Sequence, residues 1–161
     1  FSRMIEFPIT GAMVGEAERL AAEVPVLRNS IRSGEGTVYG MMGELVFIGL
    51  KGVIHDSTYD HDVVMPSGVT IDVKTKCVTS PPRLDYECSV AAYNTKQKCD
   101  AYVFMRVMKD LSRGWYLGGL WKDEFFSTAR FVKKGDLEGS NNWTATADCY
   151  SVKIKDLRCN E

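Results

Sequence analysis

The spacing of apolar and polar residues predicts two helices and a β-hairpin in the first half of the chain. Residues 13–24 and 37–50 carry apolar side chains at helical spacing, and Pro25 and Gly52 follow them as stop signals. Residues 59–65 and 69–76 instead alternate between the two kinds of residue, which is typical of half-buried strands. The Pro-Ser-Gly sequence between them predicts a hairpin loop.

The second half predicts one more long helix and several strands. Pro81 and Pro82 precede a third helix at about residues 85–98, and residues 101–108 form a strongly apolar strand. The same spacing patterns predict shorter elements, namely a short helix at 122–127 and strands near 53–55, 114–120, 129–132 and 150–154. The predicted fold class is therefore α/β, with the order αβββαβ and a β-rich tail.

Length and composition indicate one folded domain. The chain has 161 residues, of which 45% are hydrophobic and 25% charged, as in ordinary globular proteins rather than disordered or collagen-like chains. Its longest purely apolar stretch, residues 45–50, is far shorter than the ~20 residues of a membrane span. With no signal peptide recognised, we expect a single domain over residues 4–161 in the cytoplasm, away from membranes.

The net charge of −1 conceals an uneven distribution. Residues 1–71 carry a charge of −4, residues 72–134 carry +5 and residues 135–161 carry −2. A basic middle segment can present a basic face to an anionic partner although the whole chain is nearly neutral. The five cysteines show no C-x-x-C pair and no zinc-finger spacing, so we expect buried thiols rather than a metal centre or a disulfide framework.

The loop length of the predicted hairpin decides which charged side chains meet. A two-residue loop would leave Asp62 and Asp72 on opposite faces. A three-residue loop ending at Gly68 sets Asp62 directly opposite Asp72, with Lys74 on the same side and Asp60 opposite Lys74. We favour the longer loop because it also joins the apolar positions on one face. Two facing carboxylates repel each other unless a cation lies between them, and Mg²⁺ takes such oxygen ligands.

Glu44 is a third acidic residue in an apolar setting. It lies within the second predicted helix among methionine, leucine and isoleucine, where an unpaired charge would be costly to bury. One interpretation is a salt bridge to Lys51 or Lys76, and the other is a place in a metal site.

Three segments together resemble the PD-(D/E)xK nuclease superfamily, in its phage and bacterial forms. They are residues 40–44 (Gly-Met-Met-Gly-Glu), 59–64 (Tyr-Asp-His-Asp-Val-Val) and 71–76 (Ile-Asp-Val-Lys-Thr-Lys). The resemblance covers about residues 37–108 and implies a restriction-endonuclease-like αβββαβ core with a mixed central sheet, followed by a C-terminal extension at 109–161. It also implies a Mg²⁺- or Mn²⁺-dependent endonuclease that hydrolyses DNA phosphodiester bonds.

The resemblance assigns roles residue by residue. The catalytic set is Glu44, Asp62, Asp72 and Lys74, of which the three acids are the implied metal ligands. Many members also place a polar residue of the second core helix near the site; the secondary candidates here are Asp60, Lys76, Tyr93, Lys96 and Gln97. The proline that often precedes the first aspartate is absent, since His61 stands there.

Basic residues in the middle of the chain are candidates for phosphate contacts with DNA, and each could equally belong to a solvated surface. They are Lys96, Lys98, Arg130, Lys133 and Lys134. Trp115, Trp121 and Trp143 are expected to pack in the core or at an edge rather than to stack on bases. Cutting both strands of a duplex would be simplest for a homodimer.

Two other hypotheses compete with the nuclease. One is a nucleic-acid-binding domain on the same fold that does no chemistry, and it would not need all three acids together. The other treats the acids and lysines as a solvated sheet face without a ligand. The sequence carries no phosphate-binding loop, serine-hydrolase or zinc-protease motif.

Overall fold

A computed structural model describes residues 4–23, 37–51, 54–55, 62–92, 97–138 and 143–158. Within these residues the largest unit is a six-stranded central sheet in the order β1-β7-β6-β4-β3-β2. Its strands are β1 (Ile5–Pro8), β2 (Ile54–His55), β3 (Val63–Val64), β4 (Thr70–Val78), β6 (Ala101–Met108) and β7 (Arg113–Trp121). The pair β4 and β6 is parallel and the other neighbours are antiparallel, so the sheet is mixed, as the sequence predicts.

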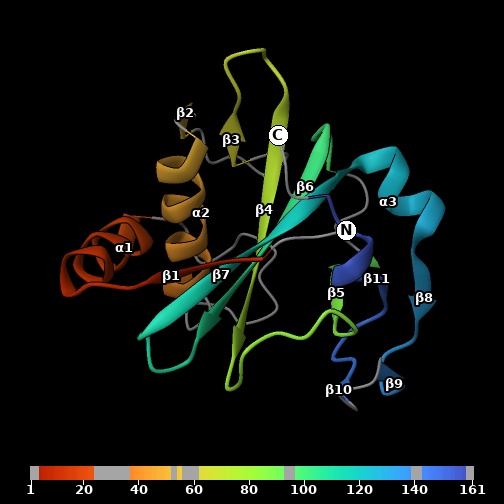
Figure 1. Cartoon of the computed structure of the whole chain (residues 1–161). Helices are drawn as coiled ribbons and strands as arrows, with labels where there is room; N and C mark the ends of the chain where they lie inside the picture. The colour runs from red at the N-terminus through yellow and green to blue at the C-terminus, as the bar shows by residue number, and fades with distance from the viewer. Residues whose placement is uncertain are drawn as a thin grey trace.

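Helices and a second sheet cover the two faces of the central sheet (Figure 1). The helices α1 (Gly11–Glu23) and α2 (Thr37–Lys51) pack together on one side. On the other side lie α3 (Lys122–Thr128) and a three-stranded antiparallel sheet of β5 (Glu87–Ala91), β11 (Cys149–Lys153) and β8 (Arg130–Val132). The described residues also form the small pair β9 (Leu137–Glu138) and β10 (Trp143–Thr144) and a 3-10 turn, η2 (Ile154–Asp156).

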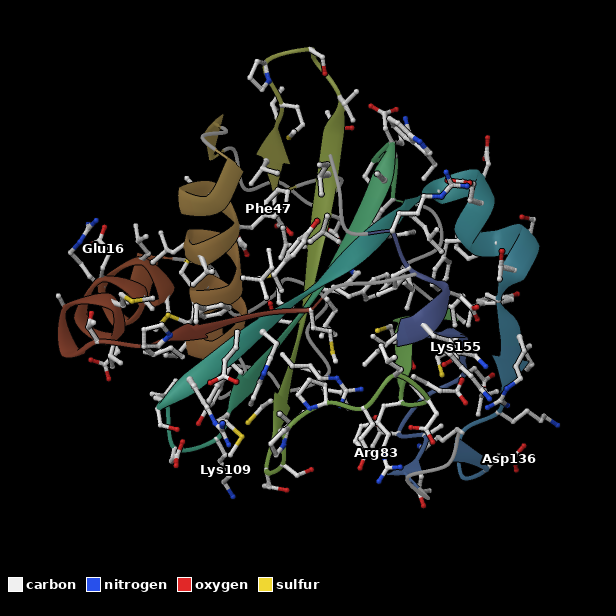
Figure 2. The ribbon with its side chains drawn as sticks, viewed as in Figure 1. Glu16, Phe47, Arg83, Lys109, Asp136 and Lys155 are labelled. Carbon is white, nitrogen blue, oxygen red and sulfur yellow. The ribbon has the colours of Figure 1, made fainter. Side chains whose placement is uncertain are left out.

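Strand β6 joins two hydrophobic cores because successive side chains point to opposite faces. Val103, Met105 and Val107 face the core shared with α1 and α2. Tyr102 and Phe104 face the core shared with the second sheet and α3. Figure 2 shows Phe47 between α2 and the sheet, where its ring stacks on Tyr116 with centroids 6.1 Å apart.

Most of the predicted elements are confirmed. The first two helices, the strands of the second half and the short helix at 122–127 occur within one or two residues of their expected bounds. The hairpin register is also confirmed, since Val63 pairs with Ile71 and the Met65 N–H donates to the Val69 carbonyl oxygen at 2.8 Å. Gly68 closes the three-residue loop with φ +93°, a conformation that glycine adopts without steric cost. Residues 59–61 lie outside the described residues.

The third predicted helix, at 85–98, is wrong over its described part. Residues 87–91 form strand β5, and Gln97 and Lys98 lie in an irregular segment. The partner of β5 is β11, which lies about sixty residues later in the sequence and which no local pattern identifies. Tertiary pairing therefore overrides a helical spacing of apolar residues.

Trp121 departs from its expected packed position, since its side chain is 52% exposed, whereas Trp115 is buried. Cys88, Cys99 and Cys149 are buried as expected, Cys77 is half-buried, and these four described cysteines are free thiols. Within the described chain, no helix has the length and hydropathy to cross a membrane.

Candidate functional site

Three acidic side chains are buried where α2, β3 and β4 meet. Glu44 lies on α2, Asp62 directly precedes β3, and Asp72 is the third residue of β4. Their exposed fractions are 8%, 8% and 4%. Burying ionised carboxyl groups is costly unless cations or hydrogen bonds compensate, so this concentration of acids requires an explanation.

Asp62 is held by the main chain of β4. Its N–H donates to the Ile71 carbonyl oxygen at 2.9 Å, and its Oδ2 accepts from the Val73 N–H at 2.8 Å. The Asp62 side chain thus takes the place of a backbone–backbone hydrogen bond between neighbouring strands at the point where β3 begins. This bond fixes the carboxyl group beside β4 without neutralising its charge.

The acids influence one another electrostatically. Burial raises the pKa of Asp62 well above its ordinary value, and the carboxylates of Asp72 and Glu44 raise it further. The Val73 N–H and the Lys74 ammonium oppose this increase in the pKa. The folded chain therefore brings together the three acids that the sequence selected.

Lys74 and Gln97 complete the arrangement around Asp72. Lys74 Nζ lies 2.7 Å from Asp72 Oδ2, and it donates to Gln97 Oε1 at 3.2 Å. Gln97 Nε2 donates to Asp72 Oδ1 at 3.3 Å. A buried amide thus bridges the acid and the lysine, and limits the directions in which the ammonium group can point.

The donor set fits a hard divalent cation. Lys74 and Asp72 Oδ2 meet as an ion pair rather than in hydrogen-bond geometry, so this buried oxygen has no hydrogen-bond partner within the described residues. Among those residues, no three histidine, cysteine, aspartate or glutamate side chains form a preassembled metal cage. Mg²⁺ does not need one, because it is usually bound by one or two carboxylates together with water and substrate phosphate. The pair of Asp62 and Asp72 meets that requirement, and Glu44 stays a predicted third ligand.

The other candidate residues are divided among different places. Lys76 follows Lys74 by two positions on β4 and is half-buried. Asp60, Tyr93 and Lys96 lie outside the described residues, so their predicted roles stay predictions.

The described candidates for phosphate contacts are spread over different parts of the fold. Lys98 is exposed and directly follows Gln97. Arg130 lies 2.8 Å from the buried carboxylate of Glu87, so its charge is already paired. Lys133 and Lys134 are exposed just beyond β8, which Figure 1 draws well away from β4.

Sequence reasoning missed four residues that adjoin the site. The Lys122 ammonium group donates to the main-chain oxygen of Gln97. Burial, followed by the charge of Asp72, raises the pKa of Cys99 to about 11. Asp100 accepts from the N–H and the hydroxyl of Thr70, and Trp121 lies beside them at the end of β7. Cys99 and Asp100 directly precede β6, and Trp121 and Lys122 lie where β7 meets α3, so the pairing of β6 with β7 brings these two segments together.

No protein-family model matches the chain, and no curated protein matches it significantly.

Proposed function

We propose that the protein is a Mg²⁺- or Mn²⁺-dependent endodeoxyribonuclease of the PD-(D/E)xK type. The observation that carries the proposal is the group formed by the buried Asp62, Asp72 and Gln97 with the half-buried Lys74, and with Glu44 within electrostatic reach of Asp62. A solvated sheet face would not require buried, mutually repelling acids joined to a lysine by an amide.

The order of elements adds support from the fold. Along the chain, helix α2 is followed by strands β2 to β4 and later by β6, which pairs with β4 in parallel. A restriction-endonuclease-like core likewise begins with one helix and three strands and ends with a further strand. The connection between β4 and β6 differs from that fold over its described part, because it contains strand β5 where a helix is expected.

Each residue has a defined task in the proposed hydrolysis. Asp62 and Asp72 would hold the metal ion through their carboxylate oxygens, with Glu44 as the third ligand. When bound, Mg²⁺ neutralises phosphate charge and lowers the pKa of water. The Lys74 ammonium orients the attacking water and stabilises the negative charge that develops on the phosphate oxygens. Gln97 positions that ammonium group through its Oε1.

The test is a cleavage assay with Mg²⁺ on plasmid, linear duplex, single-stranded and branched DNA. Asp72→Asn and Lys74→Ala should each lower the cleavage rate at least ~100-fold, because each removes a group that acts in the transition state. Asn can still accept the Gln97 hydrogen bond, so the fold should survive, as checked by circular dichroism.

Matched controls come from exposed residues of the C-terminal segment. Asp136→Asn and Lys155→Ala change exposed residues that Figure 2 labels to the right of β4, and both should leave the rate unchanged. Undiminished cutting by Asp72→Asn and Lys74→Ala would overturn the proposal.

A DNA-binding domain without chemistry is the second candidate. It is favoured by the close contact of Lys74 with Asp72, since an ammonium group can take the place of a metal ion as the neutralising charge. Such a domain would bind DNA with the same affinity in Mg²⁺ and in EDTA at constant ionic strength, and would cut none of the substrates.

A further inference from the structure

Trp121 is an exposed tryptophan at the rim of a hollow beside the acidic site. It is the last residue of β7, and its neighbour on β6 is the small Ala101, which leaves its surroundings open. Its side chain is 52% exposed and belongs to none of the hydrophobic cores in the described residues. A large flat aromatic group in this position is free to contact a ligand.

The hollow is large enough for a flat aromatic guest. Its volume is ≈ 480 Å³, and it is lined by Val69, Cys99, Asp100, Trp121, Lys122 and Asp123. These residues come from the beginnings of β4 and β6 and from the junction of β7 with α3, which meet at the upper right of Figure 1. The volume lies within the ~300–1,000 Å³ of small-molecule sites.

The wall of the hollow adjoins the residues of the acidic site. Lys122, in its wall, donates to the main-chain oxygen of Gln97, and the side chain of Gln97 contacts both Asp72 and Lys74. Cys99, also in the wall, is close enough to Asp72 for that carboxylate to influence its pKa. The hollow and the acidic site are therefore neighbours that share the contacts of Gln97 and Cys99.

The chemistry of the wall favours a base over a phosphate. Two carboxylates, Asp100 and Asp123, outnumber the single ammonium group of Lys122, and that group already donates to Gln97. Carboxylates repel phosphate and accept hydrogen bonds from the amino groups on base edges. The exposed indole supplies a stacking surface, and every base has a flat face.

We propose that this hollow binds an unpaired nucleobase by stacking on Trp121, beside the phosphate held at the acidic site. This inference rests on the proposed nuclease function and narrows its substrate to DNA with an unpaired nucleotide next to the cut. A base within a duplex is stacked on both faces and cannot reach the indole unless it leaves the helix.

Binding measurements under non-cleaving conditions test the stacking itself. The probes are a fluorescein-labelled 12-nucleotide single strand, a blunt duplex of the same sequence and a duplex with a 5′ flap, each titrated in EDTA and followed by fluorescence anisotropy. Trp121→Ala should weaken single-strand and flap binding by ~5- to 150-fold, the range for losing one base stack. It should leave duplex binding unchanged, and Trp121→Phe should retain most of the affinity.

Phe131→Ala is the matched control, because Phe131 is an aromatic residue of similar exposure on β8, away from the hollow. It should bind all three probes like the unaltered protein. Since Trp121 is exposed, its substitution should leave the melting temperature within a few degrees of the original value.

The outcomes separate this inference from the proposed function. If the protein cuts DNA and Trp121→Ala binds and cuts single strands, flaps and duplexes as before, the stacking site is wrong and the nuclease stands. If no substrate is cut but Trp121→Ala loses single-strand binding selectively, the nuclease is wrong and the stacking site stands. An equal loss on all three probes, or a change only in self-association of the chain, overturns the stacking site.

Discussion

At the scale of single residues, the chain carries unfavourable charges where the proposed chemistry needs them. Asp62 is buried, hydrogen-bonded to the Val73 N–H and close to two other acids. The hydrogen bond explains where the carboxyl group lies, whereas the raised pKa means that its ionised form is costly in the folded state. Such a cost is typical of sites that trade stability for function.

We predict that Asp62→Asn stabilises the metal-free protein. The pKa of Asp62 is higher in the folded than in the unfolded chain, so between these two pKa values the folded chain holds a proton that the unfolded chain has lost, and stability falls as the pH rises. The neutral amide of the variant removes this penalty. The gain in the free energy of unfolding should be largest at pH 8 and should disappear only below the ordinary carboxyl pKa of ~4, where both states are protonated. Urea denaturation in EDTA at pH 8 and at about pH 3.5 measures both effects.

The same variant should respond less to divalent ions. Adding 10 mM Mg²⁺ should raise the melting temperature of the original protein and raise that of Asp62→Asn by a smaller amount, because ligand binding stabilises only the folded state. Equal shifts in the two proteins would argue against Asp62 as a ligand.

At the scale of elements, the position of the site depends on how closely α2 approaches β4. Gly43 faces Thr75, the residue after Lys74, and a Cβ atom at this position would overlap the Thr75 side chain. Glu44 is the next residue on the helix, so this close approach brings its carboxyl group toward Asp62, whose pKa its charge raises. The hydroxyl of Thr75 has no hydrogen-bond partner among the described residues, which is consistent with packing rather than bonding at this contact.

We predict that two glycines of α2 respond oppositely to alanine. Gly43→Ala should destabilise the protein by ~1–3 kcal/mol, because overpacking forces the helix and strand apart. Gly40→Ala, where nothing lies within 4 Å of the added methyl group, should stabilise it by ~0.5–1 kcal/mol through helix propensity. Thermal melts of both variants measure the difference.

A second substitution tests the proposed cause. Adding Thr75→Ala to Gly43→Ala removes the overlapping side chain and should recover part of the lost stability, giving a favourable coupling energy in the double-mutant cycle. Strictly additive effects would show that the two residues do not compete for space.

At the scale of the whole molecule, the residues after position 108 contribute to both cores. Tyr116 packs with the helical layer, while Trp115, Phe125, Val152 and Ile154 build the second core. Tyr102 belongs to this second core and packs beneath Lys74, whose Nζ lies 5.9 Å from the centroid of the Tyr102 ring. The second core therefore supports the face of the sheet that carries Lys74. The C-terminal strands therefore stabilise the sheet that carries the site.

We predict that Ile154→Ala destabilises the protein by ~2–5 kcal/mol, although it lies about eighty residues from Asp72 in the sequence. Ile154 is fully buried, so the substitution leaves a cavity in the second core. Ile5→Ala is the control, because Ile5 is 44% exposed on β1, and it should cost less than ~1 kcal/mol. Similar losses for both isoleucines, measured by urea denaturation, would contradict a structural role for the C-terminal segment.

The sequence by itself determined the features that depend on neighbouring residues. The hairpin register followed from the alternation of apolar and polar residues along two strands and from Gly68 at the third position of the loop. These features were sufficient because side-chain direction and turn geometry are local properties. That register brought Asp62, Asp72 and Lys74 to one place, and the helical spacing around Glu44 added the third acid.

Only the tertiary structure decided what depends on distant partners. Strand β5 forms because β11 pairs with it, and Gln97 enters the site from an irregular segment rather than from the predicted helix. Trp121 is exposed because its strand ends beside Ala101 at the rim of a hollow formed where the beginnings of β4 and β6 meet the junction of β7 with α3. The physical reason is that strand pairing and the packing of layers join residues far apart in the chain, and the free energy of those contacts exceeds the local preferences that a sequence pattern displays.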